Sequence, residues 1–175
     1  MLQPARKYGG TAFEFEIEGY SDSDFAKDES RRSITGYATF LEKAPVTMKS
    51  GMQKCISLSV TEAEFMALTL CVQDMLFIWN VLKSTRFKAK LPMTVWCDNK
   101  GAVDLANNWS VSGYTRHVAT KLNFLRELKE EGVIEVKWIS GAENCADLFT
   151  KNLGRGAFEK HTHVFAGEDN YYKKK

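Results

Sequence analysis

The chain has 175 residues, of which 44% are hydrophobic and 26% are charged, and its formal net charge is +2. These values are ordinary for one globular domain, and so small a net charge does not by itself indicate binding to nucleic acid. The four cysteines, Cys55, Cys71, Cys97 and Cys145, form no CxxC pair, which argues against a structural zinc site or a disulfide framework.

The N-terminal sequence lacks the apolar core of a signal peptide, and no apolar run approaches the length of a membrane span. We therefore expect an intracellular soluble protein, or a soluble piece of a longer one, with no membrane partner. Residues 1–11, which contain Pro4 and a Gly–Gly pair, predict a linker. A single domain is expected over 12–155, followed by a tail over 156–175 that is ordered at first and then frayed.

Three β-rich runs follow the linker. In the first run, Phe13, Phe15 and Ile17 alternate with glutamates, and this period of two predicts a strand. The second run is 33–42, and the third extends from Pro45 through Cys55, Ile56 and Leu58. Short polar turns separate the three runs, which favours an antiparallel meander.

A long helix is predicted next, with Ser59 or Thr61 as its cap. Steps of three and four residues place an apolar stripe on one face of this helix, with Glu64 at its head. The stripe consists of Glu64, Leu68, Cys71, Met75, Ile78 and Leu82.

The remaining pattern alternates strands and helices. The order β-β-β-α-β-α-α-β-α predicts an α/β fold with a mixed sheet covered by helices. The expected elements are a strand over 93–98, a helix over 99–108, a helix over 116–130, a strand over 133–140 and a short helix over 144–153.

Four carboxylates, Asp22, Glu64, Asp98 and Asp147, lie at the start or end of these elements. Converging carboxylates repel one another unless a cation lies between them, and a divalent metal is the usual cation. The first hypothesis is therefore a metal-dependent phosphoryl-transfer enzyme. Local alternatives stay open, because Asp98 could cap the next helix and both Glu64 and Asp147 could simply compensate a helix dipole.

Asp22 is the least certain of the four, and Asp24 competes with it. Strict alternation from Phe13 places Asp22 on the face of Glu14 and Glu16, away from the expected core. A bulge at Gly19 would reset this register, or the core face could be the one that carries Tyr20.

Several sequence blocks, in order, resemble the ribonuclease H domain of copia-type (Pseudoviridae-like) LTR retrotransposon polyproteins. They are GYSDSDFA, RRSITGYATFLE, SLSVTEAEFMAL, VWCDNKGAVDLANN, TRHV and NCADLFTKNL. The resemblance runs from Gly19 to Leu153 and implies a ribonuclease H-like fold, a five-stranded mixed sheet of order 3-2-1-4-5 flanked by helices. It also implies that Asp22, Glu64, Asp98 and Asp147 bind metal and catalyse hydrolysis of the RNA strand of RNA/DNA hybrids.

The implied cofactor is two Mg²⁺ ions about 4 Å apart, for which Mn²⁺ could substitute. Asp22 would bridge both ions, with Glu64 and Asp98 on one and Asp147 on the other. The implied partners are an RNA/DNA hybrid and a reverse-transcriptase domain of the same polyprotein, in the cytoplasm or in virus-like particles. Candidate contacts to the substrate are Ser23, Ser59, Thr61, Asn99, Lys100, Arg116 and His117.

One departure from the wider ribonuclease H pattern is the loop SGAEN, which lacks the histidine that many cellular members place there; Glu143 is a speculative substitute. His161 and His163, near the tail, are expected to be exposed. Two rival hypotheses remain: a related-fold nuclease that acts on DNA, and a retroelement-derived domain that binds nucleic acid or protein without cleaving it.

Overall fold

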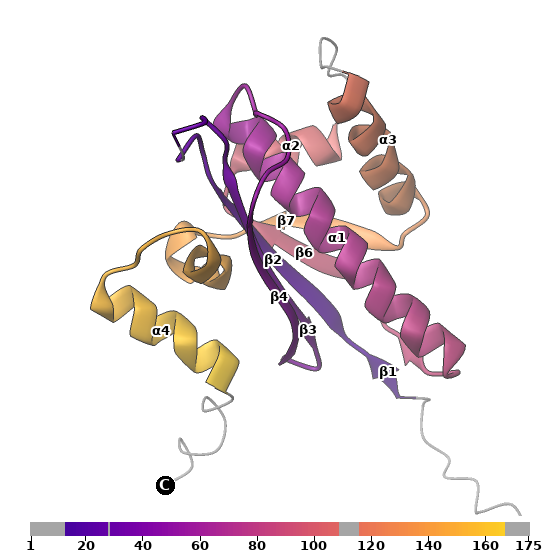
Figure 1. Cartoon of the computed structure of the whole chain (residues 1–175). Coiled ribbons are helices and arrows are strands. Elements are labelled where there is room, and N and C mark those ends of the chain that lie inside the picture. Colours follow the sequence, from indigo (N-terminus) through magenta and orange to yellow (C-terminus); the bar gives the residue numbers. More distant parts are fainter. Residues whose placement is uncertain (1–12, 28, 109–115, 167–175) are drawn as a thin grey trace, which may run out of the picture.

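The computed structural model describes residues 13–27, 29–108 and 116–166, and the predicted linker lies outside them. A five-stranded mixed sheet forms the centre of the molecule, in the order β4-β3-β2-β6-β7 (Figure 1). Numbered along the chain, this is the predicted order 3-2-1-4-5, and the predicted fold class is confirmed. The strands are β2 (Ile17–Asp24), β3 (Ile34–Leu41), β4 (Ala44–Met52), β6 (Met93–Cys97) and β7 (Ile134–Trp138).

The sheet has an antiparallel half, β2-β3-β4, and a parallel half, β2-β6-β7. Strand β4 ends at Met52, earlier than predicted, because its partner β3 begins at Ile34, opposite Met52. Beyond this point the Gln53 side chain turns inward and donates to the carbonyl of Ala63 at 2.9 Å. Ile56 and Leu58, predicted as strand residues, lie outside the strands and are 53% and 78% exposed.

The predicted first strand is divided in two. Residues Glu14–Phe15 form β1, which pairs in parallel with β5 (Lys88–Ala89) in a separate two-stranded sheet. Phe13 is 66% exposed, whereas Ile17 is buried in the main core. The alternation therefore predicted a strand correctly but did not reveal the break before Ile17.

Helix α1 (Val60–Ser84) packs across β2, β3 and β6 and provides the largest part of the core (Figure 1). Ser59 is its cap and accepts a hydrogen bond from the backbone N–H of Glu62 at 3.1 Å. Every member of the predicted stripe from Glu64 to Leu82 is buried, as are the Cys71 and Cys97 thiols. Helices α2 (Lys100–Asn107) and α3 (Arg116–Glu130) cover the β6-β7 side.

Helix α1 is long and apolar enough to cross a membrane, with a mean hydropathy of 1.6 over an 18-residue window. The sequence-based expectation was that no apolar run approaches the length of a membrane span. The packing of α1 accounts for its composition, because 56% of that window is buried inside the protein. A core helix that lies against a sheet must be apolar over a wide arc.

The opposite face of the sheet is covered by the C-terminal part of the chain. The 3₁₀ turns η1 (Gly141–Glu143) and η2 (Cys145–Phe149) lead to helix α4 (Arg155–Ala166). Ring contacts of Phe165 with Phe40 and Phe149, each at 5.5 Å between centroids, fix α4 to this face. The helix predicted over 144–153 is thus a 3₁₀ turn with i→i+3 hydrogen bonds, and α4 lies where the sequence pattern predicted a tail.

Candidate active site

Asp22 lies near the end of β2 on the face that η2 covers. The β2–β3 pairing is continuous from Ile17–Leu41 to Asp24–Ile34, so the predicted alternative of a bulge at Gly19 is wrong. Alternation therefore holds from Ile17 to Asp24, but the inference that the face of Asp22 lies away from the core was wrong. Asp22 is 0% exposed because the sheet is covered on both faces at this end.

Asp98 directly follows β6, and Glu64 lies in the second turn of α1. Asn99, and not Asp98, caps α2: the Asn99 side chain accepts from the N–H of Ala102 at 2.9 Å. The local role proposed for Glu64 belongs instead to Glu62, whose carboxylate accepts from the N–H of Leu58 at 2.8 Å. The Asp98 and Glu64 carboxylates are thus not used as caps.

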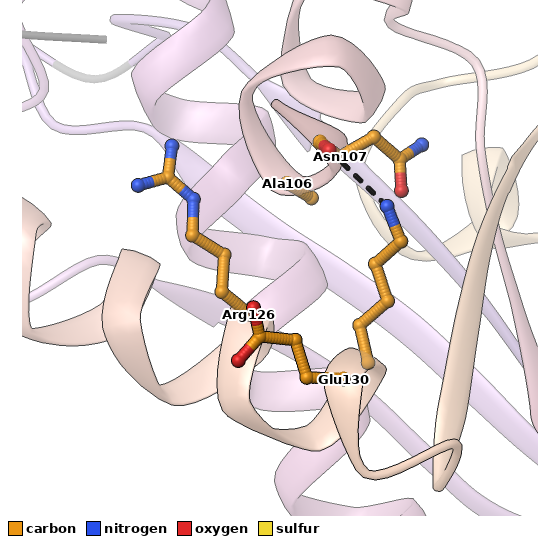
Figure 2. Close-up of a pocket in the computed structure, with 5 residues that line it drawn as sticks. Ala106, Asn107, Arg126 and Glu130 are labelled. Carbon is orange, nitrogen blue, oxygen red and sulfur yellow. Dashed lines mark hydrogen bonds between the residues drawn. The ribbon is translucent and has the colours of Figure 1, made fainter. Parts of the chain in front are cut away.

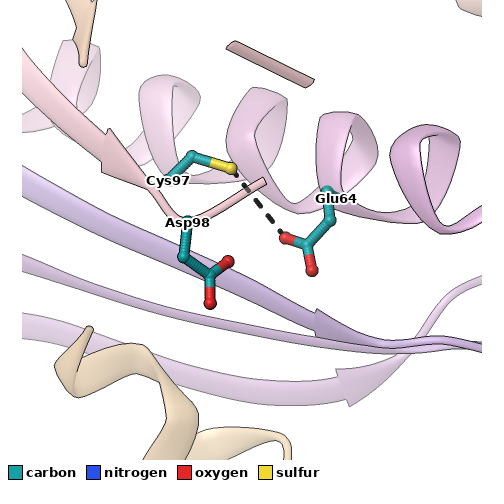
Figure 3. A group of neighbouring side chains, drawn as sticks. All are labelled: Glu64, Cys97 and Asp98. Atoms are coloured by element: carbon teal, nitrogen blue, oxygen red, sulfur yellow. Dashed lines mark hydrogen bonds between the residues drawn. The ribbon is translucent and has the colours of Figure 1, made fainter. Parts of the chain in front are cut away.

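The four carboxylates converge in two overlapping groups. One group consists of Asp22, Asp98 and Asp147, and the other of Glu64, Cys97 and Asp98; within each group the candidate ligand atoms lie within 4.8 Å of one another. Figure 3 shows the Asp98 carboxylate beside that of Glu64, with the Cys97 thiol 4.0 Å from a Glu64 oxygen. Asp24, the competitor of Asp22, belongs to neither group and pairs with Lys27 at 2.9 Å.

Crowding and burial make these carboxylates hard to ionise. Burial, followed by the charges of Asp22 and Asp98, raises the pKa of Glu64 to about 8. Burial also raises the pKa of Asp22 to about 6, although Thr150 and Lys151 oppose the shift. A cation bound among the carboxylates would relieve this repulsion, and carboxylate oxygens are the ligands that hard divalent ions prefer. The donor set therefore fits a divalent metal.

Three side chains that support the site were not among the sequence-based candidates. Thr150 donates a short hydrogen bond to Asp22, and the Lys151 ammonium lies 3.0 Å from Asp22 Oδ1 and 2.9 Å from Asp147 Oδ1. Asn144 donates to the Ser21 carbonyl at 2.9 Å and accepts from the Ala146 N–H. The ADLFTK block contains Thr150 and Lys151, but nothing in its pattern indicates where their side chains point.

Two glycines allow the site segments to approach one another. A Cβ atom at Gly36 of β3 would lie 2.5 Å from Thr150 Cγ2 and 2.8 Å from Phe149 Cβ. A Cβ atom at Gly141 would lie 3.1 Å from Asp98 Oδ2. The segment that carries Asp147 can therefore lie directly against the sheet.

The predicted substrate contacts surround the carboxylates to different extents. Ser23 is buried beside Glu64, and Thr61 meets Asn99 at Gly101, where the starts of α1 and α2 approach each other. Ser59 and Asn99 serve as helix caps. The Lys100 ammonium lies 4.9 Å above the Trp138 ring. The side chains of Arg116 and His117 lie outside the described part of the structure.

Glu143 and His161, both near the site, differ in their exposure to solvent. Glu143 is exposed in η1. His161 is buried in α4, at 4% exposure, so the prediction that it would be exposed was wrong. The unrecognised helix α4 explains the error, since one face of a packed helix must turn inward. Burial lowers the pKa of His161.

A cavity of about 300 Å³ between α2 and α3 lies apart from the carboxylates and is lined by Ala106, Asn107, Arg126, Lys129 and Glu130 (Figure 2). The two cationic side chains that line it, Arg126 and Lys129, donate hydrogen bonds to carbonyls at the C-terminal end of α2. Lys129 donates to the Asn107 carbonyl at 3.1 Å, and Arg126 donates to the Leu105 and Asn108 carbonyls. Cations at a helix C-terminus satisfy its free carbonyls, so a structural role accounts for both side chains.

The sheet order and the acidic edge define a ribonuclease H-like fold, and solved structures confirm it. LC11-RNase H1, isolated from compost, superposes with a TM-score of 0.58 at 17% identity, covering 84% of this chain and 98% of that one. The same enzyme in complex with an RNA/DNA hybrid also gives a TM-score of 0.58. No protein-family model matches the chain.

The sequence relatives include retrovirus-related Pol polyproteins. The chain is 34% identical over 144 residues to that of transposon TNT 1-94 from Nicotiana tabacum, and 31% identical over 144 residues to that of transposon RE1 from Arabidopsis thaliana. Each alignment covers 82% of this chain but only 11% and 10% of the polyproteins. The predicted resemblance to a retrotransposon ribonuclease H domain is therefore confirmed, and the chain spans about a tenth of the length of these relatives.

Proposed function

We propose that this chain is a ribonuclease H that hydrolyses the RNA strand of RNA/DNA hybrids with Mg²⁺ held by Asp22, Glu64, Asp98 and Asp147. The observation that carries the proposal is the convergence of these four carboxylates at one edge of a ribonuclease H fold. Mn²⁺ is expected to substitute for Mg²⁺, because both ions favour oxygen ligands.

Bound Mg²⁺ supplies a water of lowered pKa and neutralises charge on the phosphate and the leaving oxygen, and two ions would divide these tasks. The protein contributes the positions of the carboxylates that would hold the metal. Asp98 belongs to both carboxylate groups and so links Asp22 and Asp147 to Glu64. Thr150 and Asn144 fix Asp22 and the turn that carries Asp147. No side chain needs to act as the nucleophile.

Hybrid recognition requires groups that read 2′-hydroxyls and phosphates near the metal. Ser23, Ser59, Thr61 and Asn99 lie at the starts of α1 and α2 and at the end of β2, where they could contact the minor groove. Lys100, Arg116 and His117 are proposed phosphate contacts. The Pol polyprotein relatives support a role in reverse transcription, with a reverse-transcriptase domain as partner, in the cytoplasm or in virus-like particles.

A cleavage assay tests the proposal. The wild-type protein is incubated with end-labelled RNA/DNA hybrid and Mg²⁺, beside Asp98→Asn and the control Asp104→Asn, an exposed carboxylate of α2. We expect cleavage of the RNA strand by the wild type and the control, and a loss on the order of a hundredfold or more for Asp98→Asn, because a ligand charge is removed.

Two other results would contradict the proposal in different ways. Cleavage of duplex DNA but not of the hybrid would identify the related-fold DNA nuclease. Binding of hybrid without any cleavage, by a folded wild-type protein in saturating Mg²⁺, would identify a silent retroelement-derived domain.

A further inference from the structure

Lys151 places a positive charge inside the carboxylate site. It follows η2, and its Nζ atom lies 3.0 Å from Asp22 Oδ1 and 2.9 Å from Asp147 Oδ1. The side chain of Asp22 is 0% exposed and that of Asp147 is 15% exposed, whereas that of Lys151 is 37% exposed. A lysine that reaches in from solvent therefore joins two carboxylates that come from opposite ends of the chain.

Asp22 has a partner on each of its oxygens in this arrangement. Lys151 contacts Oδ1, and the Thr150 hydroxyl donates to Oδ2. Asp22 and Asp147 carry like charges within 4.8 Å, and such charges separate unless a cation stands between them. The Lys151 ammonium supplies that cation, so this arrangement of the carboxylates does not require a metal.

A metal would need the same two carboxylates. Asp22 and Asp147, together with Asp98, form one of the two groups that could hold a divalent ion. The ammonium and a divalent ion repel each other, and both would draw on the carboxylates of Asp22 and Asp147. The flexible four-carbon stem of lysine and the partial exposure of Lys151 give the ammonium a path to solvent.

We propose that Lys151 is a built-in counterion that occupies this half of the site before metal loading and is displaced when the metal binds. This inference rests on the proposed metal-dependent function and deepens it. Lys151 keeps Asp22 and Asp147 close together in the metal-free protein. It also lowers the affinity of the site for metal, because part of the binding free energy is used to break two charge-assisted contacts.

Two variants and a control test this role. Lys151→Met keeps the length of the stem and removes the charge. Lys151→Arg keeps the charge and offers more N–H donors to the Asp22 and Asp147 carboxylates than lysine does. Lys27→Met is the matched control, because Lys27 pairs at 2.9 Å with Asp24, an aspartate of the same strand outside the site.

The first measurement is Mg²⁺ affinity by calorimetry without nucleic acid. We expect Lys151→Met to bind Mg²⁺ on the order of tenfold more tightly than wild type, and Lys151→Arg to bind more weakly. Lys27→Met should match wild type. The second measurement is thermal unfolding in EDTA, in which Lys151→Met should lose several degrees in Tm.

The results separate this inference from the proposed function. Unchanged or weaker Mg²⁺ binding by Lys151→Met, or tighter binding by Lys151→Arg, overturns the role of Lys151 while leaving metal-dependent cleavage intact. Absence of Mg²⁺ binding in the wild type and in every variant overturns both. If Lys151→Met does not fold in EDTA, Lys151→Arg, which keeps the charge, still decides between the outcomes.

Discussion

Glu64 is 4% exposed, and burial together with the charges of Asp22 and Asp98 raises its pKa from 4.5 to about 8. The folded metal-free protein therefore holds a proton that the unfolded chain releases above pH 4.5. This contribution to stability is fully present below pH 4.5 and is lost as the pH rises through 8. The buried Glu64 carboxylate thus destabilises the metal-free fold at neutral and higher pH.

Replacing Glu64 by glutamine should remove this loss. In EDTA at pH 8 we expect Glu64→Gln to be more stable than wild type by roughly 2–4 kcal/mol, and near pH 4.5 the two should be about equal. Urea denaturation at a series of pH values measures the difference. Glu127→Gln, at an exposed position on α3, is the control. A wild-type curve parallel to that of Glu64→Gln over this range would contradict the prediction.

At the residue scale, the motifs predicted which carboxylates meet, but not the side chains that support them. Local patterns left Asp98 and Glu64 with possible capping roles, and only the contacts of Asn99 and Glu62 removed those alternatives. Lys151 could not be assigned from sequence, because the direction of its side chain depends on how η2 packs. A lysine after a polar turn is equally typical of a solvated surface.

Element η2 positions Asp147, and its closeness to β3 depends on Gly36. A methyl group at Gly36 would lie within 2.8 Å of atoms in both Thr150 and Phe149. The turn would have to move, and Thr150 and Lys151 would move with it. The position of Asp147 therefore depends on the absence of a side chain at Gly36 in the neighbouring strand β3.

The matched pair Gly36→Ala and Gly51→Ala tests this dependence. Gly36→Ala should destabilise the protein by about 1–3 kcal/mol through overpacking and should weaken Mg²⁺ binding, since Asp147 shifts with the turn. Gly51 lies in β4 with nothing within 4 Å of its added Cβ, and its variant should stay within about 0.5 kcal/mol of wild type. Equal effects in the two variants, measured by urea denaturation and calorimetry, would refute the role of Gly36.

At the element scale, periodic segments were predictable and aperiodic ones were not. The stripe on α1 and the alternation in β2 follow from 3.6- and 2-residue periods, which burial imposes directly. Element η2 spans one short turn, and α4 has no clear apolar period, so neither produces a pattern that can be read. Their packing, through Phe165 on Phe40 and Phe149, is a tertiary effect.

At the scale of the whole molecule, the site exists only when the sheet has assembled. Asp22, Glu64, Asp98 and Asp147 come from β2, α1, the end of β6 and η2. The sheet order followed from the resemblance to ribonuclease H domains, whereas the order of the elements alone predicted only a mixed sheet covered by helices. In the unfolded chain the carboxylates are far apart, so a metal would have little affinity for that state, and its binding free energy would contribute to folding.

Metal should therefore stabilise the folded protein by an amount that grows with the logarithm of the free metal concentration above its Kd. With free Mg²⁺ at about 100 times its Kd, we expect the free energy of unfolding to rise by about 2.7 kcal/mol, with an unchanged dependence on urea. Asp98→Asn should lose most of this gain, because Asp98 belongs to both carboxylate groups, whereas Asp104→Asn should keep it. Urea titrations in EDTA and in Mg²⁺ measure each value. Equal stabilisation of Asp98→Asn and wild type would show a general salt effect and would rule out coupling between folding and this site.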